Sequence, residues 1–394
     1  MNVLDVLLII AALGFAVSGY RQGFVVGVLS VVGFIGGGLI AVQFLPLLLK
    51  HLSPGAVSSI VAVVVVIVCA SIGQAITTHW GWRLRKLVVR GPIRPLDGFG
   101  GAVVNVGAML LVAWLIGSAL AGTSLPTVSK QVRESRILAG VQQALPPGAS
   151  EWFGNFSSVL ARNGFPQVFN PFQNEPITQV QAPDPALVHS AGVRRASGSI
   201  VKVEGTANSC GKIIEGSGFV YSPHRVITNA HVVGGVTSPT VQIGGVGSLY
   251  RAKVVLYDPE RDIAVLDVPS LDAPSLSFAG PAKTDDSAIV AGFPENGPFD
   301  VQPARVRGEI QASGPDIYHN QTVVRDVYSL YSTVRQGNSG GPLLTPDGRV
   351  YGVVFAKSLD SSNTGYALTA AEVRSDAAAG ENRTQPVDTQ GCAL

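Results

Sequence analysis

The chain has 394 residues, which is enough for two or three folded units, and a formal net charge of +2. This weak charge gives no reason to expect a nucleic-acid partner. Only 14% of the residues are charged, and the mean hydropathy is positive. Such a composition is too apolar for a wholly soluble protein of this length, so we expect a membrane portion.

Four apolar segments in the first third of the chain are about long enough to span a membrane. They cover residues 3–19, 24–49, 56–78 and 101–121. A helix needs about 20 apolar residues to cross a hydrocarbon core of roughly 30 Å. The first segment lacks the basic start of a cleaved signal peptide, and three more follow it. We therefore predict an α-helical membrane domain of four spans over residues 1–121.

Basic residues indicate the orientation of these spans. The connection between the third and fourth spans is strongly basic and holds Arg83, Arg85, Lys86, Arg90 and Arg94. Arg21, between the first two spans, falls on the same side, and Lys50 falls on the other. Because basic connections stay in the cytoplasm, we expect both termini and everything after residue 121 to be extracytoplasmic. The protein would then be a multi-pass inner-membrane protein, in contact with lipid, with a periplasmic C-terminal portion.

Residues 122–192 form the predicted connection between the membrane and the rest of the chain. Ser129–Leu145 has a helical pattern that Pro146 and Pro147 end. Several prolines after residue 165 indicate an extended tether. The sequence leaves open whether the tether is a stalk, a site of self-cleavage or a segment packed on the following domain.

Residues 193–394 have the pattern of an all-β domain. Six short apolar or alternating runs lie between residues 199 and 268, and six more lie between 287 and 368. Two sets of six strands fit two six-stranded barrels, whose closure removes exposed edges. The small and polar residues 376–394 are expected to form a tail.

A glycine-rich turn surrounds Ser339. Residues 336–342 are Gln-Gly-Asn-Ser-Gly-Gly-Pro. Gly337 allows the backbone to bend so that the amides of Gly337 and Ser339 converge on one point, which suits a developing oxyanion. A serine between glycines can also present its hydroxyl to a substrate. By itself, the pattern is equally typical of a plain turn.

Two further residues have the types that activate a serine. His231 follows an apolar strand, and Asp262 precedes another. The imidazole would take the serine proton, and the carboxylate would hold the imidazolium. The order His231, Asp262, Ser339 is that of the two-barrel serine proteases. Asp267 is the reserve for the acid, and we expect neither a metal site nor a cofactor.

Two of the three cysteines, Cys210 and Cys392, lie on the expected oxidising side, where disulfides persist. We expect a bridge that ties the tail to the first barrel, and two free thiols are the alternative. In the chain-entropy model, a disulfide that closes a loop of more than about 100 residues stabilises the folded state by roughly 5 kcal/mol. Whether the bridge is structural or a redox switch stays open, and Cys69 in a span should be inert.

The stretches Thr-Asn-Ala-His-Val-Val, Asp-Ile-Ala-Val-Leu and Gly-Asn-Ser-Gly-Gly-Pro together resemble the chymotrypsin-like serine proteases, especially those of the bacterial HtrA type. The resemblance implies a serine endopeptidase with an oxyanion hole at Gly337 and Ser339 and a substrate pocket at Thr333 and Phe355. Because Thr333 is uncharged, we expect no strict preference for Lys or Arg. Asn338 replaces the aspartate of zymogen-activated relatives, which implies that no new N-terminus is needed.

The four spans, the early Asp5 and the Gly-Tyr-Arg-Gln-Gly-Phe turn at residues 19–24 resemble the colicin V production protein family. Together with one protease domain and no PDZ domain, they resemble the MarP-type actinobacterial membrane-anchored periplasmic serine proteases. This implies cleavage of cell-envelope proteins, such as peptidoglycan hydrolases, in acid and oxidative stress. The alternative is a protease-like binding scaffold or regulator on a membrane transport or sensor domain. The oligomeric state stays unknown.

Overall fold

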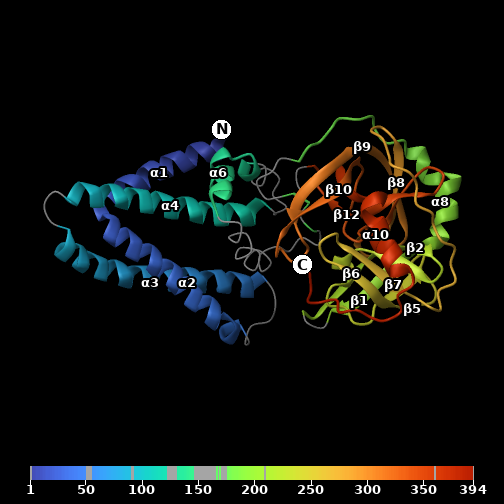
Figure 1. The fold of residues 1–394 in the computed structure, drawn as a ribbon, viewed down its shortest axis with the longest axis horizontal. Helices are drawn as coiled ribbons and strands as arrows, with labels where there is room; N and C mark the ends of the chain where they lie inside the picture. Colours follow the sequence, from blue (N-terminus) through green and yellow to red (C-terminus); the bar gives the residue numbers. More distant parts are fainter. Residues whose placement is uncertain are drawn as a thin grey trace. The chain divides into compact units, whose positions relative to one another are not determined.

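The computed structural model falls into two compact units, each with its own helices or strands (Figure 1). Unit 1 comprises Met1–Leu120 and Gln131–Leu145, and unit 2 comprises Ala121–Lys130 and Pro146–Leu394. The structure describes residues 2–49, 56–89, 93–121, 131–145, 166, 168–169, 175–207, 210–358 and 361–393.

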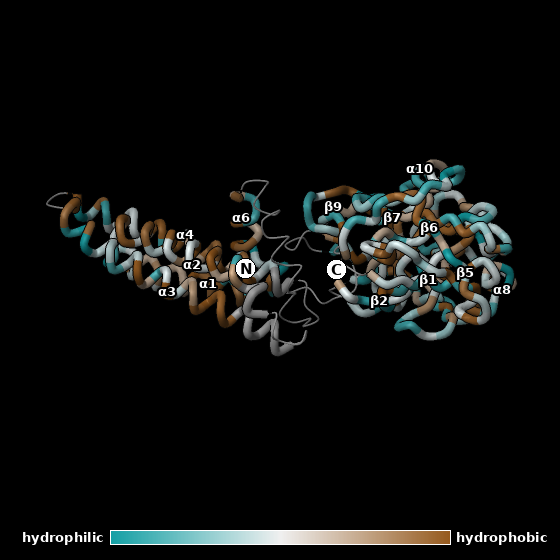
Figure 2. The backbone as a smooth tube through the Cα atoms, turned by 90° about the horizontal axis from the view of Figure 1, so that it is seen from below, coloured by the Kyte–Doolittle hydropathy of each residue, from teal (hydrophilic) through white to brown (hydrophobic). Residues whose placement is uncertain are grey.

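The main elements in the described part of unit 1 are four long helices and one short one. They are α1 (Val3–Gln22), α2 (Phe24–Leu49), α3 (Ala56–Val88), α4 (Arg94–Ala121) and α6 (Arg136–Ala144). By length and composition, the four long helices can each cross a membrane, and their apolar stretches are brown in Figure 2. α3 runs through the basic residues to Val88, and α4 begins seven residues before the predicted span at 101. The basic stretch is therefore mostly the end of a helix rather than a loop.

Glycines bring α2 and α3 close together. A Cβ on Gly33 or Gly37 of α2 would collide with the backbone of α3, at Gly73 and Cys69 respectively. Gly33 and Gly37 are four residues apart and so lie on one face of the helix. Small residues of this kind let two membrane helices approach closely, as the glycine-rich run predicts.

The short helix α6 is attached to the start of α1. The carboxylate of Asp5 accepts hydrogen bonds from Ser135 Oγ at 2.6 Å and from the amide of Ile137 at 3.3 Å. Asp5 thus caps the N-terminus of α6, where backbone donors lack partners within the helix. Residues 131–145 therefore belong to the compact unit 1, although the sequence analysis placed them in the connection over residues 122–192.

Unit 2 begins with a seven-stranded antiparallel sheet in the order β5-β4-β1-β2-β3-β7-β6. The sequence analysis predicted a closed six-stranded barrel here, whereas these strands pair as an open sheet that ends at β5 and β6. The sheet has one strand more than expected, because the short β5 adds to its edge. The strands are β1 (Ile200–Ala207), β2 (Lys212–Ser222), β3 (Arg225–Thr228), β4 (Thr240–Ile243), β5 (Tyr250–Arg251), β6 (Lys253–Asp258) and β7 (Ile263–Asp267).

The later strands close into a six-stranded barrel, as predicted, in the order β10-β13-β12-β11-β8-β9. Its members are β8 (Ser287–Gly292), β9 (Asp300–Pro315), β10 (Thr322–Tyr331), β11 (Pro342–Leu344), β12 (Val350–Lys357) and β13 (Thr364–Thr369). One buried cluster joins Phe219 and Ile227 of the sheet to Phe355 and Leu368 of the barrel. The sheet and the barrel therefore share a hydrophobic core.

A helix that the sequence analysis did not predict follows the barrel. α10 (Ala370–Glu381) is capped by Thr369, whose side chain accepts a hydrogen bond from the amide of Glu372. Tyr221 donates to the carbonyl of Ala377 at 2.8 Å, which ties α10 to the first sheet. The expected tail thus begins after a helix that packs on the sheet.

The described part of the tether lies along the barrel. Arg307 Nη1 donates to the carbonyl of Thr178 at 2.6 Å, and Arg305 Nη2 donates to that of Ala182 at 3.3 Å. Glu175 accepts a hydrogen bond from the hydroxyl of Tyr366 at 2.9 Å. Of the three possibilities left open by the sequence, packing on the protease domain holds for residues 175–184. Residues 146–165 lie outside the described part of the chain.

Candidate active site

His231 and Asp262 meet because their strands are neighbours. His231 lies in the short turn α9 (Ala230–Val233) directly after β3, and Asp262 directly precedes β7. β3 and β7 are antiparallel, with Thr228 opposite Ala264. The residues that follow one strand and precede the other are therefore brought to the same end of the sheet.

The carboxylate of Asp262 holds His231 at two points. Oδ2 lies 2.7 Å from His231 Nδ1, and Oδ1 accepts from the His231 amide at 2.9 Å. Asn229 Nδ2 donates to the carbonyl of Asp262 at 2.7 Å. A carboxylate at Nδ1 favours the tautomer with the proton on Nδ1, which leaves Nε2 free to act as a base.

The loop that carries Ser339 depends on glycine. Gly337 and Gly340 have φ angles of 91° and 83°, values that favour glycine. A Cβ at Gly337 would collide with the carbonyl of Phe293. Ser217 of β2 binds the same loop, since its hydroxyl donates to the carbonyl of Gly337 at 2.6 Å and its amide to that of Ser339 at 2.8 Å. The first sheet thus helps to position a loop of the barrel.

Two backbone amides of this loop are free to bind a ligand. The amides of Asn338 and Gly340 donate to the carbonyls of Arg335 and Val354, at 3.0 and 2.8 Å. The amides of Gly337 and Ser339 have no acceptor among the residues that the structure describes. A pair of unoccupied donors beside a serine hydroxyl is the arrangement that an oxyanion requires.

The hydroxyl of Ser339 donates to a backbone carbonyl rather than to His231 among the described residues. Its Oγ lies 3.4 Å from the carbonyl of Phe355, and no hydrogen bond joins it to His231 in the described structure. The side chain is nearly buried. Catalytic hydrogen bonds are often long or unformed in the absence of substrate, so this rotamer is compatible with a nucleophile.

The sequence analysis also predicted Thr333 and Phe355 as pocket residues and Asp267 as the reserve acid. Thr333 is exposed in the loop after β10. The side chain of Phe355 is fully buried in the core, so it lines no open pocket, and its carbonyl is the group that faces Ser339. Asp267, the reserve acid, pairs with Arg225 rather than with His231.

Arg325 of β10 is a further residue at the site, with a side chain that is 1% exposed. Its Nε donates to the carbonyl of Glu260 at 2.6 Å, and both Nη atoms donate to that of Pro315 at 3.2 Å. Burial lowers the pKa of its guanidinium, and the carboxylate of Asp262 acts in the opposite sense. Arg325 thus connects the barrel to the turn that carries Asp262. No sequence motif marked it, because an arginine in a strand is usually exposed.

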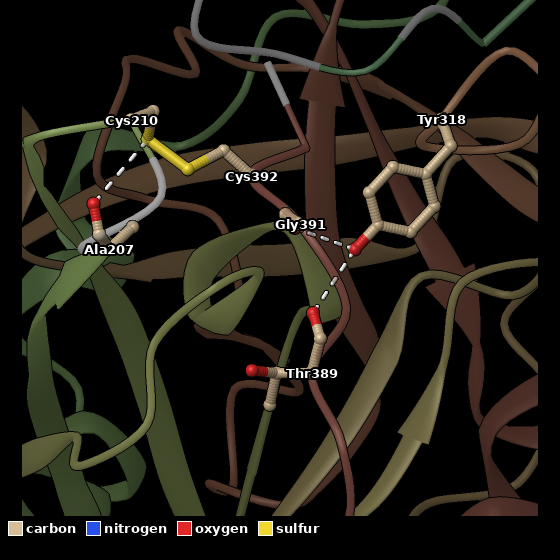
Figure 3. The surroundings of a disulfide bond; sticks show 6 residues. All are labelled: Ala207, Cys210, Tyr318, Thr389, Gly391 and Cys392. Atoms are coloured by element: carbon tan, nitrogen blue, oxygen red, sulfur yellow. Dashed lines mark hydrogen bonds between the residues drawn. A yellow bond between two sulfur atoms is a disulfide. The ribbon is translucent and has the colours of Figure 1, made fainter.

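A disulfide fixes the C-terminal tail (Figure 3). Cys210 and Cys392 are bonded, as the sequence analysis expected. Tyr318, from the barrel, donates to the carbonyls of Thr389 and Gly391 at 3.2 and 2.9 Å. Ala393 packs in one cluster with Ala230, the residue before His231.

Comparison with known proteins gives two domain families and a full-length relative. The trypsin-like peptidase domain matches residues 216–353, and the colicin V production protein family matches residues 4–146. Serine protease Rv3671c of Mycobacterium tuberculosis (strain ATCC 25618 / H37Rv) is 38% identical over 392 residues, which cover 99% of this chain and 98% of the relative. The chain belongs to the Rv3671c family of serine proteases.

A solved structure of the same relative and a shorter match to another protease agree with this assignment. The crystal structure of the Rv3671c protease in its active form is 46% identical, with a TM-score of 0.54, and covers 58% of this chain and 100% of that one. A probable periplasmic serine endoprotease, DegP-like, of Chlamydia pneumoniae is 36% identical over 159 residues, or 39% of this chain and 30% of the relative. These findings confirm the predicted MarP-type resemblance, the fold class and the enzyme class.

Proposed function

We propose that this Rv3671c-family chain is a membrane-anchored serine endopeptidase whose catalytic triad is His231, Asp262 and Ser339. The observation that carries the proposal is the two-point contact between Asp262 and His231, 2.7 Å from the ring nitrogen and 2.9 Å from the amide. A core histidine needs only one such partner. Two contacts from a fully buried carboxylate orient the ring for proton transfer.

The reaction would follow acyl transfer. After its hydroxyl turns from the Phe355 carbonyl towards His231, Ser339 Oγ attacks the scissile carbonyl and His231 Nε2 takes the proton. Asp262 stabilises the imidazolium, and the amides of Gly337 and Ser339 bind the oxyanion. His231 then gives the proton to the leaving amine. Water hydrolyses the acyl-enzyme by the same steps in reverse.

Substrate selection would depend on the barrel. We assign the base of the side-chain pocket to Thr333 and the backbone contact to the strand around Phe355. An uncharged, exposed residue at the base favours a neutral residue before the scissile bond. No fixed positive or negative charge would then select a charged one.

The proposed setting is the outer face of the inner membrane. Residues 1–121 would form the anchor, 122–192 the connection and 193–394 the protease domain, with residues 131–145 attached to the anchor. The disulfide between Cys210 and Cys392 supports an oxidising compartment. Envelope proteins, including peptidoglycan hydrolases, are the proposed substrates, in acid and oxidative stress.

Full-length protein in lipid nanodiscs provides the test. We expect it to cleave β-casein, and Ser339→Ala to abolish cleavage, because loss of a serine nucleophile reduces turnover roughly a million-fold in a related protease. Mass spectrometry of the fragments would give the residue before each cut. Equal cleavage by the two proteins would contradict the assignment of the nucleophile, and cuts only after Lys or Arg would contradict the assigned pocket.

A further inference from the structure

A polar cavity of about 650 Å³ is lined by all four long helices of unit 1. It is open to the surroundings of the helices, and the lining residues Ser18, Ser71 and Gln74 are exposed. Ala11, Gly14 and Phe15 contribute the apolar part of its wall on α1. All but one of its remaining lining residues carry uncharged hydrogen-bonding side chains, among them Ser18, Gln22, Ser71, Gln74 and Asn105. No Asp, Glu, Lys, Arg or His is among the described residues that line it.

The polar lining follows from the spacing along the helices. On α3, Ser71, Gln74 and Thr78 are three and four residues apart, so they lie on one face. On α1, Ser18 and Gln22 are four apart. Two polar stripes therefore face one cavity, within helices that are otherwise apolar.

The side chains of the cavity satisfy one another only in part. Gln74 Nε2 donates to Ser30 Oγ at 2.9 Å, and Gln22 Nε2 donates to Ser18 Oγ at 3.2 Å. Asn105 Nδ2 donates to a carbonyl of its own helix at 3.0 Å. The three amide oxygens accept no hydrogen bond from any described residue, so each can still bind a donor.

The cavity reaches deep into the proposed membrane layer. Ser71 precedes Arg83 by 12 residues, which is about 18 Å along a helix. Because Arg83 is near the basic end of the span, Ser71 lies near the middle of a core roughly 30 Å thick. Polar side chains at such a depth normally face protein or a water-filled space, since lipid cannot hydrogen-bond to them.

We propose that this cavity is a hydrated site for a small uncharged solute with hydroxyl or amide groups. A charged solute would lose its hydration without meeting a counter-charge. The ion pair between Arg85 of α3 and Asp97 of α4 offers no counter-charge to such a solute, because the two side chains are 2.7 Å apart. They also bind the backbone, at Arg21 and Val25 respectively. The volume is typical of a small-molecule site.

Cysteine accessibility tests the site, which rests on the proposed membrane anchor. The full-length protein with Cys69→Ala would carry one new cysteine, at the cavity (Ser71→Cys or Ser18→Cys) or at its neighbour (Ile72→Cys or Val17→Cys). The neighbours are 54% and 56% exposed and do not line the cavity. Proteoliposomes would react with hydroxyethyl methanethiosulfonate, which is uncharged, and with its ammonium and sulfonate analogues. All rates would be normalised to a free thiol in water.

We expect the uncharged reagent to modify each cavity cysteine about tenfold faster than its neighbour, because reaction needs a thiolate and hence water. We also expect it to react there about tenfold faster than the charged analogues. Equal rates at cavity and neighbour would show that lipid or protein fills the cavity, and equal rates for charged reagents would refute an uncharged solute. If alkaline carbonate extracted the protein from the membrane, both the proposed membrane anchor and the proposed solute site would be contradicted. Casein cleavage would still test the protease domain separately.

Discussion

The two halves of the candidate active site differ in how completely they are assembled. His231 and Asp262 are joined at two points, at 2.7 and 2.9 Å, by neighbouring strands of one sheet. Ser339 lies on a barrel loop, and its hydroxyl lies 3.4 Å from the carbonyl of Phe355 instead of binding His231. Local pairing thus builds the acid–base half, whereas the nucleophile half needs contacts between the sheet and the barrel.

This difference indicates where the enzyme is preorganised and where it must adjust. The proposed base, His231, is held by Asp262 at Nδ1, which leaves Nε2 available to a substrate. In the proposed mechanism the Ser339 hydroxyl leaves the Phe355 carbonyl and turns to His231, and side-chain rotations are fast compared with turnover. The backbone of the serine loop is already fixed by Ser217. The following predictions change one half at a time.

Asp262→Asn should have the largest effect, a loss of about 10⁴-fold in kcat, because the amide would favour the wrong imidazole tautomer. This substitution would disrupt the contact between Asp262 and His231 that the structure shows already formed. Steady-state cleavage of a peptide derived from the casein cut sites would measure it. Asp272→Asn, at an exposed aspartate nearby, is the matched control and should retain full activity. Full activity of Asp262→Asn would remove Asp262 from the triad.

Gly337→Ala tests the nucleophile half. The added Cβ would collide with the Phe293 carbonyl, and the φ of 91° is unfavourable for alanine. We expect the displaced amide to reduce kcat by roughly 10²- to 10³-fold, the cost of one oxyanion donor. Gly280→Ala, where no atom lies within 4 Å of an added Cβ, is the control. Unchanged kcat would show that the Gly337 amide does not bind the oxyanion.

Arg325→Met tests the connection between the two halves. The turn before Asp262 would lose its bond from the barrel, and we expect kcat to fall roughly tenfold with KM unchanged, since misplaced catalytic groups slow the chemical step. Active-site titration would correct the rate for unfolded protein. Arg325→Lys should recover part of the rate, and the exposed Arg251→Met should have no effect. An unaltered corrected kcat would mean that Asp262 is held by its own sheet alone.

Asp376→Asn should have the smallest effect, on stability rather than on rate. Burial, together with Asp258, raises the pKa of Asp376 to about 6, although Arg261 lies 3.8 Å away. One carboxylate oxygen of Asp376 is buried without a partner among the described residues, which favours the protonated carboxyl. The folded chain then binds this proton more tightly than the unfolded chain, so the contribution to the free energy of unfolding falls as the pH rises from about 4 to 6.

A shift of two pKa units corresponds to about 2.7 kcal/mol, which solvent screening reduces to about 1 kcal/mol. Relative to Asp376→Asn, the native protein should therefore gain about 2–4 °C in Tm when the pH is lowered from 7 to 4. Near-UV circular dichroism during heating of both proteins at each pH would measure it. A constant difference between the two proteins across this range would show that Asp376 titrates normally.

Short patterns predicted the residues that lie in the acid–base half and the nucleophile loop. His231, Asp262 and Ser339 each follow or precede a strand, and glycine marks the loop that needs positive φ. Patterns could not reveal Arg325, which contacts a turn about 65 residues away in sequence. Such contacts depend on how the sheet and the barrel pack, which no local spacing records.

The sequence predicted the membrane helices, for which the length of the apolar run is sufficient evidence. It did not predict α10 or the attachment of α6. The four spans follow from composition, although α4 begins earlier than its apolar run. The signal for α10 was present in Thr369 and Glu372, a cap spaced three residues apart, but the small residues that follow resemble a tail. The attachment of α6 to Asp5 joins residues about 130 apart and leaves no local trace.

The most direct test of the central claim is to locate a fluorophosphonate label on the full-length protein. The probe reacts with a serine only when a base activates it. We predict a single labelled peptide containing Ser339 in the native protein, and loss of labelling in His231→Ala, which keeps the serine but removes the base. Labelling of another serine, or labelling of Ser339 that survives in His231→Ala, would contradict a triad of these three residues.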